Sequence, residues 1–255
     1  MIEEGLQNKR VLITGGSRGI GLAAANRFAA TGANVIVASR HAPPDDTPGT
    51  HLTADVSTRA GVRDLARRAL DLAGGVDVLV NNAGAGTPPS TILERQDETW
   101  LADLDINLMS AVRLDRELVP GMVERGAGVV IHVSSIAAKR PQPIQIGYSA
   151  MKAALNTYSR GLADEVSPSG VRVLCVLPGF VATPGAVAQH QRFADRRGIS
   201  LSETQRELAV DLRVPMGRPG TPEEAAELIV FLASDRARWL TGAEYRVDGG
   251  ILAEV

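Results

Sequence analysis

The sequence predicts a single doubly wound α/β domain with about seven parallel strands and helices on both faces of the sheet. Short β-branched runs alternate with longer segments that carry apolar residues at helical spacing, which is the order of a parallel sheet with crossover helices. Several of the short runs are almost continuously apolar, as expected of strands buried on both faces. The length of 255 residues, with 44% hydrophobic and 22% charged residues, suits one globular domain, which we expect to span residues 1–255.

The elements follow one another in a regular order. Strands are expected at residues 10–14, 34–39, near 51–53, 76–81, 128–134, 171–177 and 244–247. Helices are expected at residues 19–31, 59–72, 99–124, 147–166 and 221–232. The last helix has a clear start, because Thr221 offers a capping hydroxyl, Pro222 takes the first helical position, and two acids follow in the first turn.

Two segments interrupt this alternation. Residues 40–50 contain three prolines and therefore cannot form a full crossover helix. Residues 183–217 are longer than an ordinary connection, and their second half, 202–212, could be helical. Long insertions in compact domains often serve as lids or binding loops, so we expect 183–217 to be a substrate-binding insertion.

Composition and charge exclude several classes of protein. The 27 Lys and Arg residues nearly balance the 29 Asp and Glu residues, so the net charge of −2 gives no electrostatic reason to expect nucleic acid or an anionic membrane as a partner. No apolar run approaches the ~20 residues of a membrane span, and the first residues do not resemble a signal peptide. The single cysteine, Cys175, cannot close a disulfide within the chain. We therefore expect a cytoplasmic protein that binds neither membranes nor nucleic acid.

A glycine-rich turn joins the first strand to the first helix. Glycines let the backbone turn sharply and approach a ligand closely, and the N-terminus of the following helix attracts a pyrophosphate. Placed between strand and helix, such a turn indicates a Rossmann-like dinucleotide site, although an ordinary glycine-rich turn would look similar. The residues expected to hold the cofactor here are Gly15, Ser17, Arg18, Gly19, Ile20 and Gly21.

The end of the second strand indicates which dinucleotide is bound. NAD-binding proteins carry an acidic residue near this position that accepts hydrogen bonds from the ribose 2′-hydroxyl. Here the position holds Ser39, followed by Arg40, and Arg18 projects from the glycine turn nearby. Guanidinium groups suit the additional phosphate of NADP, so we expect NADP(H) as the cofactor. Both arginines could instead be solvated surface residues.

Residues directly after the third and fourth strands could line the adenine and ribose. This group comprises Asp55, Val56, Asn82, Ala83 and Gly84. Asp or Asn beside glycine is also common in ordinary turns, so each signal is weak alone.

The pair Tyr148 and Lys152 carries the sharpest chemical signal. Four residues apart on a predicted helix, the two side chains share one face. A nearby ammonium favours the phenolate and is expected to lower the pKa of the tyrosine, which would let it exchange a proton at neutral pH. Lys152 is one of only 3 lysines in a chain with 24 arginines, so its presence calls for a reason. An amphipathic helix with a packed tyrosine and an exposed lysine is the alternative.

Two further polar residues could complete a catalytic site. Ser135 ends the fifth strand, and its hydroxyl could stabilise the charge that grows on a substrate carbonyl as hydride arrives. Ser134 is its local competitor. Asn107 lies within the long predicted helix over 99–124, where an inward-facing side chain could hold a water on a proton path to Lys152.

Together these motifs resemble the short-chain dehydrogenase/reductase family over nearly the whole chain. The resemblance implies that Asn107, Ser135, Tyr148 and Lys152 form a catalytic tetrad, with Tyr148 as general acid in reduction and general base in oxidation. It also implies that Lys152 lowers the pKa of Tyr148 and holds the nicotinamide ribose, that Ser135 positions the carbonyl and that Asn107 supports a proton relay. The stretch expected to meet the nicotinamide comprises Pro178, Gly179, Val181 and Thr183.

Other candidate ligands have weaker support. The four histidines (His41, His51, His132 and His190) are scattered without metal-binding spacing, so no metal is expected, and Cys175 is expected to be an inert buried thiol. Lys139 and Arg140, or the insertion's Arg192, Arg196 and Arg197, could attract an anionic substrate, but such residues are more often solvated, and we prefer that interpretation. A partly apolar substrate pocket is expected from Ile144, Ile146, Val181, Ala186, Val187 and Phe193.

The function expected from these residues is NADP(H)-dependent interconversion of a carbonyl compound and an alcohol by hydride transfer, with reduction favoured. A 3-oxoacyl compound and a carbonyl intermediate of secondary metabolism are both possible substrates. Alternatives are an NAD-dependent alcohol or diol dehydrogenase, a catalytically silent nucleotide-sensing module and a Rossmann-like methyltransferase. Helices 147–166 and 99–124 are apolar on more than one stripe, and the family commonly pairs such helices, so we expect a homo-oligomer, either dimer or tetramer.

Overall fold

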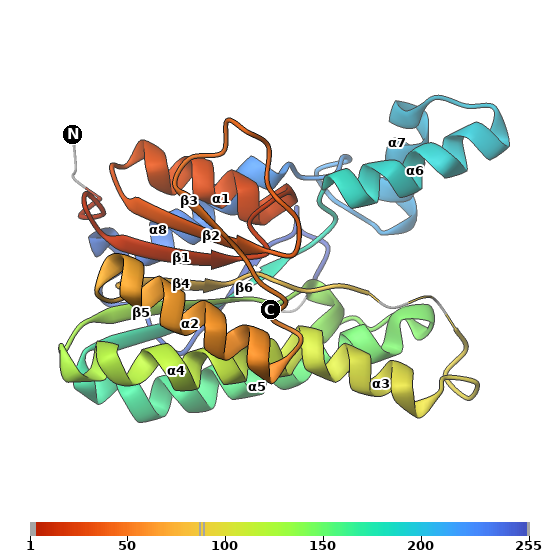
Figure 1. Cartoon of the computed structure of the whole chain (residues 1–255). Coiled ribbons are helices and arrows are strands. Elements are labelled where there is room, and N and C mark those ends of the chain that lie inside the picture. Colours follow the sequence, from red (N-terminus) through yellow and green to blue (C-terminus); the bar gives the residue numbers. More distant parts are fainter. Residues whose placement is uncertain (1–3, 87, 89, 254–255) are drawn as a thin grey trace.

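Seven parallel strands form one sheet in the order β3-β2-β1-β4-β5-β6-β7, which confirms the predicted fold class (Figure 1). The structure is a computed structural model that describes residues 4–86, 88 and 90–253. The strands are β1 (Arg10–Thr14), β2 (Asn34–Ser39), β3 (Thr50–Thr53), β4 (Val78–Asn81), β5 (Gly128–Val133), β6 (Val171–Pro178) and β7 (Glu244–Val247). The strand order reverses between β1 and β4, and ligands of such sheets bind in the crevice at the carboxyl ends of the strands.

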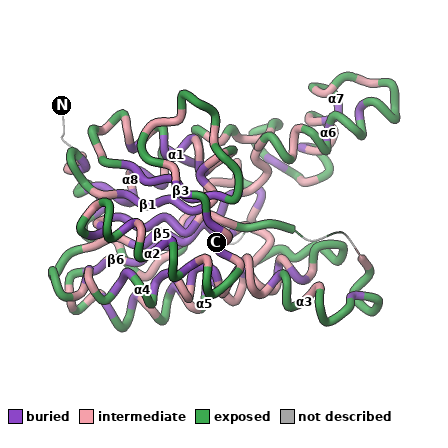
Figure 2. Tube along the Cα trace, viewed as in Figure 1, coloured by how far each residue is buried: buried purple, intermediate pink, exposed green. Residues whose placement is uncertain are grey.

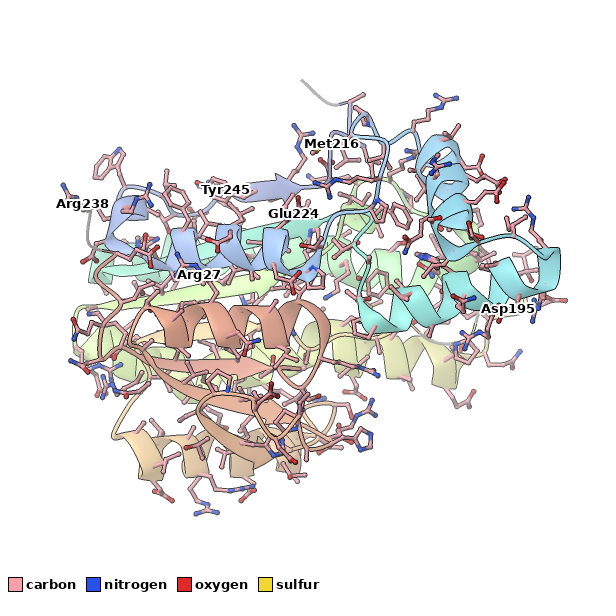
Figure 3. All side chains as sticks on the ribbon, turned by 90° about the horizontal axis from the view of Figure 1, so that it is seen from above. Arg27, Asp195, Met216, Glu224, Arg238 and Tyr245 are labelled. Atoms are coloured by element: carbon pink, nitrogen blue, oxygen red, sulfur yellow. The ribbon has the colours of Figure 1, made fainter. Side chains whose placement is uncertain are left out.

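Helices cover both faces of the sheet, as Figure 1 shows. One face carries α1 (Gly19–Ala30) and α8 (Pro222–Ala233), and the other carries α2 (Arg59–Ala73), α4 (Ser110–Glu124) and α5 (Ile146–Val166). The first pair lies side by side, as Figure 3 shows. Arg27 of α1 donates a hydrogen bond from Nε to Oε1 of Glu227 on α8 at 2.9 Å.

The core lies on both sides of the sheet, because successive residues of a strand point to opposite faces. In β1, Leu12 packs into the apolar cluster under α2 and α4, whereas Val11 and Ile13 pack into the cluster under α1 and α8. All three side chains are fully buried, and the strands stand out as the buried part of the chain in Figure 2. This confirms the prediction, made from the apolar runs, of strands covered on both faces.

The prediction of one continuous helix over 99–124 is wrong, because a π-helical turn interrupts it. The chain forms α3 (Asp97–Leu104), then a π-helical turn (Asp105–Met109), and then α4. The wider turn changes which residues face the sheet, and it buries Asn107. Apolar spacing alone does not distinguish a π-turn from a continuous α-helix, although such turns are frequent at functional sites.

The insertion after β6 contains two helices that project beyond the sheet in Figure 1. The expected helix near 202–212 is present as α7 (Leu201–Asp211), but α6 (Pro184–Arg197) was not predicted. Its start is well specified, because Thr183 accepts a hydrogen bond from the Ala186 N–H and Pro184 takes the first helical position. Residues 40–49 form no helix, as their prolines predicted.

Among the described residues, no helix combines the length and the apolar content needed to cross a membrane.

Candidate active site

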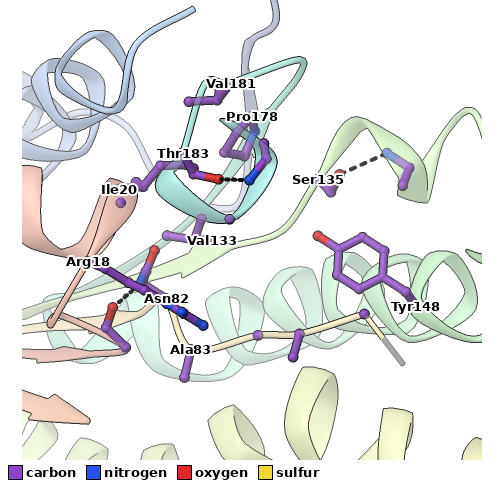
Figure 4. Close-up of a pocket in the computed structure, with 18 of the residues that line it drawn as sticks. Arg18, Ile20, Asn82, Ala83, Val133, Ser135, Tyr148, Pro178, Val181 and Thr183 are labelled. Atoms are coloured by element: carbon purple, nitrogen blue, oxygen red, sulfur yellow. Dashed lines mark hydrogen bonds between the residues drawn. The ribbon is translucent and has the colours of Figure 1, made fainter. Parts of the chain in front are cut away.

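A cleft of about 920 Å³ opens at the carboxyl ends of the strands, and it brings together nearly all of the predicted site residues (Figure 4). Residues from the glycine turn, from the ends of β2 to β6 and from the insertion line it together. Two predicted residues, Gly21 and Asn107, do not line the cleft but lie next to residues that do. The predicted lining residues are Gly15, Ser17, Arg18, Gly19, Ile20, Ser39, Arg40, Asp55, Val56, Asn82, Ala83, Gly84, Ser135, Tyr148, Lys152, Pro178, Gly179, Val181 and Thr183.

The glycine turn is held in place by the chain after β4. The side-chain amide of Asn82 donates hydrogen bonds to the carbonyl oxygens of Thr14 at 2.9 Å and Gly15 at 3.1 Å. In return, the Thr14 hydroxyl accepts hydrogen bonds from the N–H groups of Asn82 and Ala83. Asn82 therefore lines the cleft, as expected, and also supports the glycine turn with its side chain.

The turn itself leaves no room for side chains. Gly15 and Gly19 have φ of 66° and 56°, the left-handed region that favours glycine. A Cβ on Gly21 would overlap the carbonyl oxygen of Gly15. The backbone consequently forms an open cradle before the N-terminus of α1, which suits the pyrophosphate of a dinucleotide.

The far end of the cleft carries two free guanidinium groups. Arg18 and Arg40 both line it, and within the described chain neither forms an ion pair. No carboxylate stands at the end of β2, where Ser39 donates a hydrogen bond to the His41 carbonyl at 2.6 Å. Hydrogen bonds from Ser57 and the charge of Arg40 hold the pKa of Asp55 below its usual value, so Asp55 is ionised at the adjacent wall.

Tyr148 and Ser135 face each other across the cleft, as Figure 4 shows. Tyr148 lies in the first turn of α5, and Ser135 directly follows β5. Burial raises the pKa of Tyr148, whereas a hydrogen bond with Ser135 lowers it. Ser135 also accepts a hydrogen bond from the Ala137 N–H at 3.1 Å, which fixes its hydroxyl oxygen. The neighbouring Ser134 instead donates to the Lys152 carbonyl at 3.2 Å and so has a structural contact of its own.

Lys152 lies one helical turn below Tyr148, on the same side of α5. Its Nζ is 5.7 Å from the centre of the Tyr148 ring and donates a hydrogen bond to the Val133 carbonyl at 2.9 Å. The side chain is only 2% exposed, and burial lowers the pKa of the amine to about 8. The two groups therefore share one face, as the spacing predicted. The expected lowering of the tyrosine pKa is not found in the protein alone, because the desolvation of Tyr148 outweighs the favourable contacts.

Asn107 connects the π-helical turn to the chain after β4. Its side-chain amide donates to the carbonyls of Ala85 at 2.9 Å and Asp103 at 3.2 Å, and its oxygen accepts from the Ala85 N–H at 3.1 Å. A Cβ on Gly84 would lie 3.1 Å from both Asn107 Oδ1 and Lys152 Nζ, so the three residues are closely packed where they meet. Asn107 thus fixes the wall beside Lys152 with its side chain.

The nicotinamide end of the predicted cofactor site is the segment after β6. Pro178, Gly179, Val181 and Thr183 line the cleft there, and a Cβ on Gly179 would lie 2.6 Å from Cα of Asp248. The glycine cradle, the two guanidiniums and this segment follow one continuous cleft, so the residues present fit an extended dinucleotide.

The basic residues of the substrate side lie mostly outside the cleft, as the preferred interpretation of solvated residues predicted. Lys139 and Arg197 do not line the cleft; Lys139 pairs with Glu244 at 3.0 Å, and Arg197 pairs with Glu207. Arg192 and Arg196 do not line it either. Of the expected apolar pocket, Val181, Ala186 and Phe193 line the cleft, whereas Ile144, Ile146 and Val187 do not. Arg140 does line it and donates to the Leu212 carbonyl at 3.0 Å.

Several residues of the substrate side were not predicted from the sequence. They are mostly polar, whereas the pocket residues expected from the insertion were apolar, such as Ala186 and Phe193. The missed lining residues include Gln142, Gln145, Gln189, His190, Asp211 and Ile251.

A buried ion pair between Arg95 and Asp103 was not predicted from the sequence. This pair lies against Gly147, immediately before Tyr148. The alternation of strands and helices gave no sign of it.

The remaining histidines and the cysteine are not arranged as a metal site. Within the described ranges, no group of three or more His, Cys, Asp or Glu residues could hold a metal ion. His132 is a packed side chain that contacts Asp115 and Ser159 at 2.9 Å each. Burial raises the pKa of Cys175 to about 12, so the thiol is protonated and unreactive, as predicted.

Comparisons with known proteins agree with this geometry. A family model described as Enoyl-(Acyl carrier protein) reductase matches residues 15–252. The chain is 35% identical over 257 residues to 3-oxoacyl-(acyl-carrier-protein) reductase FabG of Chlamydia muridarum, covering 96% of this chain and 98% of that protein. It is 34% identical over 259 residues to D-beta-hydroxybutyrate dehydrogenase of Cupriavidus necator, covering 98% and 100%.

A solved structure is similarly close. The crystal structure of L-sorbose reductase from Gluconobacter frateurii, complexed with NADPH and L-sorbose, matches with a TM-score of 0.93 and 37% identity over 100% of both chains. Sequence matches over almost the whole chain and the shared architecture lead to one assignment. The chain belongs to the short-chain dehydrogenase/reductase family, whose oxidoreductases use nicotinamide cofactors.

Proposed function

We propose that this protein is an NADP(H)-dependent oxidoreductase that interconverts a ketone or aldehyde and the corresponding alcohol, with reduction as the favoured direction. The observation that carries the proposal is the meeting of Tyr148, Lys152 and Ser135 in one cleft with the glycine cradle. A nucleotide sensor on the same fold would need neither a buried tyrosine nor a buried lysine beside the nucleotide. A methyltransferase would not explain these three residues either.

The chain's own residues supply positioning and a proton. The bound cofactor supplies or accepts the hydride. Ser135 holds the substrate carbonyl oxygen beside the Tyr148 hydroxyl, which gives its proton to that oxygen in reduction and takes it back in oxidation. Lys152 places a positive charge beneath the phenol ring and favours the phenolate as the proton leaves. Asn107 keeps the adjoining wall in place through Ala85.

The preference for NADP(H) over NAD(H) rests on the adenosine end of the cleft. Arg18 and Arg40 are free to pair with a 2′-phosphate, and no carboxylate at Ser39 would repel it. The Gluconobacter reductase, which was solved with NADPH, supports this choice. The remaining cofactor contacts that we propose are those of the glycine turn, of Asp55 to Val56, of Asn82 to Gly84 and of Pro178 to Thr183.

The insertion 183–217 is proposed to bind the substrate, because residues of α6 and α7 line the cleft. The named relatives act on different carbonyl compounds, so the family alone does not choose among them. We further propose a cytoplasmic homo-oligomer, a dimer or a tetramer.

The proposal is tested by recording NADPH and NADH consumption at 340 nm against a panel of ketones and aldehydes, and the reverse reaction with alcohols. Replacement Tyr148→Phe removes the proton donor and is expected to lower kcat by about 100-fold or more, with the Kd for NADPH retained. A wild-type protein that binds NADPH tightly but reduces no carbonyl compound, or a Tyr148→Phe variant with full turnover, would contradict the proposal.

A further inference from the structure

The connection that follows β2 carries charged groups to the proposed adenosine end of the cleft. Residues 40–49 form neither helix nor strand, yet Arg40 and His41, the first two of them, line the cleft. Hydrogen bonds from Ser57 and then the charge of Arg40 lower the pKa of Asp55, so the guanidinium lies near the wall that Asp55 forms. An irregular segment keeps one course only where specific contacts hold it. The place of the Arg40 guanidinium therefore depends on the contacts at the end of β2.

Ser39, the last residue of β2, makes two hydrogen bonds with its side chain. The hydroxyl donates to the His41 carbonyl at 2.6 Å, and its oxygen lies 3.0 Å from Nε2 of His51 on β3. A serine hydroxyl has one proton, and a carbonyl oxygen can only accept, so that proton is used on His41. Nε2 of His51 must then carry the proton of the second bond, and the Ser39 oxygen accepts it. Ser39 is 9% exposed and has no further proton to donate.

This arrangement makes the Ser39 hydroxyl a poor ligand for a phosphate. Phosphate oxygens carry negative charge and accept hydrogen bonds, so a group that binds them has to donate. The Ser39 oxygen can only accept once its proton is given to the His41 carbonyl. The guanidinium groups of Arg18 and Arg40 line the same end of the cleft and, within the described chain, form no ion pair. The donors to a 2′-phosphate are therefore the two arginines, and Ser39 holds the chain that carries one of them.

We propose that His51 is a positioning residue for cofactor selection, which acts through Ser39 to fix the start of the connection 40–49, so that Arg40 faces the 2′-phosphate of NADP(H). The sequence led us to expect a direct contact between Ser39 and the cofactor, whereas here its hydroxyl is not a ligand of the phosphate. His51 itself does not line the cleft, and its strand β3 lies at the edge of the sheet beside β2. This inference rests on the proposed preference for NADP(H) and names the contact behind it.

The test compares two nucleotides that differ only in the 2′-phosphate. The Kd values of 2′,5′-ADP and 5′-AMP are measured by calorimetry with purified full-length protein, and those of NADP⁺ and NAD⁺ are measured in parallel. The ratio of the two Kd values reports on recognition of the phosphate without any turnover. The wild type is expected to bind 2′,5′-ADP at least about tenfold more tightly than 5′-AMP, and Arg40→Ala should remove most of this difference.

Two variants of His51 separate its hydrogen bond from its bulk. His51→Phe keeps a ring but removes the donor to Ser39, so the preference for 2′,5′-ADP should fall about fivefold while the Kd of 5′-AMP stays the same. His51→Gln places an amide donor at a similar reach and is expected to restore most of the preference. Thr53→Val is the matched control, because Thr53 is an exposed residue of the same strand, pairs with Ser39 in register and does not line the cleft. Its ratio should equal that of the wild type.

A double variant distinguishes a positioning role of Ser39 from direct binding. Ser39→Ala removes both hydrogen bonds of the hydroxyl, so it should lower the preference for 2′,5′-ADP at least as much as His51→Phe. If His51 acts through Ser39, adding His51→Phe to Ser39→Ala causes no further loss. If the hydroxyl bound the phosphate directly and His51 acted separately, the two losses would add.

The outcomes separate this inference from the proposed function. A His51→Phe variant with the wild-type ratio, additive losses in the double variant, or equal weakening of both nucleotides by His51→Phe overturns the role of His51. Each of these results leaves the preference for NADP(H) standing. A wild type that binds 2′,5′-ADP and 5′-AMP equally well overturns that preference together with the role of His51. Carbonyl reduction, measured separately at 340 nm, is independent of all of these results.

Discussion

Lys152 shows how one buried charge is both costly and useful. An ammonium that is 2% exposed loses most of its hydration, and one hydrogen bond to the Val133 carbonyl replaces only part of it. The pKa of the amine consequently falls to about 8 from a usual value of 10.5. The chain keeps this charge where a proposed proton donor, Tyr148, lies 5.7 Å away, measured to the ring centre. Burial at such cost is typical of functional sites rather than of packing.

The shifted pKa predicts a dependence of stability on pH. Between about pH 8 and 10.5 the unfolded chain binds a proton at Lys152 that the folded chain has lost, so the free energy of unfolding rises with pH in this window. The total rise is at most about 3 kcal/mol. Lys152→Met removes the titrating group, and its unfolding free energy, measured by urea denaturation at pH 8 and pH 10.5, should lack that rise. If the free energy of unfolding of the wild type and of the variant changed with pH in the same way, the lowered pKa of the Lys152 amine would be contradicted.

The two arginines at the adenosine end give a second prediction at this scale. Arg40→Ala removes a donor to the 2′-phosphate and leaves the rest of the cleft unchanged, so the NADPH to NADH ratio of kcat/KM should fall about tenfold, or 1.4 kcal/mol. Arg192→Ala, on α6 and outside the cleft, is the control and should leave the ratio unchanged. If the wild type used NADPH and NADH equally well and Arg40→Ala left the ratio of kcat/KM unchanged, the preference for NADP(H) would be excluded.

At the scale of elements, strand positions were predictable and helix details were not. Strands such as β1 and β2 were located to the residue, because each is a β-branched run buried on both faces. The π-helical turn around Asn107 was not, since it depends on the hydrogen bonds of Asn107 to Ala85, a contact between segments 22 residues apart. Helix α6 was missed because its residues are largely polar, although Thr183 and Pro184 do form a recognisable helix start.

The candidate site divides in the same way. Tyr148, Lys152 and Ser135 could be predicted because the chemistry requires particular residue types at fixed places after a strand or along one helix face. The buried ion pair that lies next to Tyr148 could not be predicted, because Arg95 and Asp103 meet only in the folded chain, where they pack against Gly147. His190 lines the cleft together with the predicted Ala186 and Phe193, but its own place there was not predicted, because α6 itself was not predicted.

Two glycines of α5 give a matched prediction about this support. A Cβ at Gly147 would overlap the Asp103 carboxylate and crowd the Arg95 guanidinium, whereas a Cβ at Gly161 meets no atom within 4 Å. Gly147→Ala should therefore destabilise the fold by about 1–3 kcal/mol and lower kcat, because Tyr148 follows directly. Gly161→Ala should stabilise it by about 0.5–1 kcal/mol through helix propensity alone. The free energy of unfolding is measured by urea denaturation and kcat by NADPH-dependent turnover. Equal effects of the two substitutions would show that the Arg95–Asp103 pair does not hold Tyr148 in place.

At the scale of the whole molecule, the sheet and its helices leave one apolar stripe incompletely covered. Ala150, Met151, Ala153 and Ala154 of α5 are only half-buried, although they are small or apolar. The cleft lies at the carboxyl end of the sheet, and α5 contributes Tyr148 and Lys152 to it from the same helix. Covering this stripe with a second copy would hold α5, and with it the proposed proton donor, more firmly.

A charge placed on the stripe tests that assembly. We expect the wild type to be a homo-oligomer at micromolar concentration by multi-angle light scattering. Ala154→Arg puts a guanidinium where an apolar contact is expected, so the variant should dissociate, with lower turnover because α5 loses support. Val210→Arg is the control, because Val210 is 70% exposed on α7, and its oligomeric state should match that of the wild type. A monomeric wild type, or an Ala154→Arg variant that keeps the wild-type mass, would show that α5 does not form the interface. Retained mass with retained turnover would also mean that the helix carrying Tyr148 and Lys152 is held by its own fold alone.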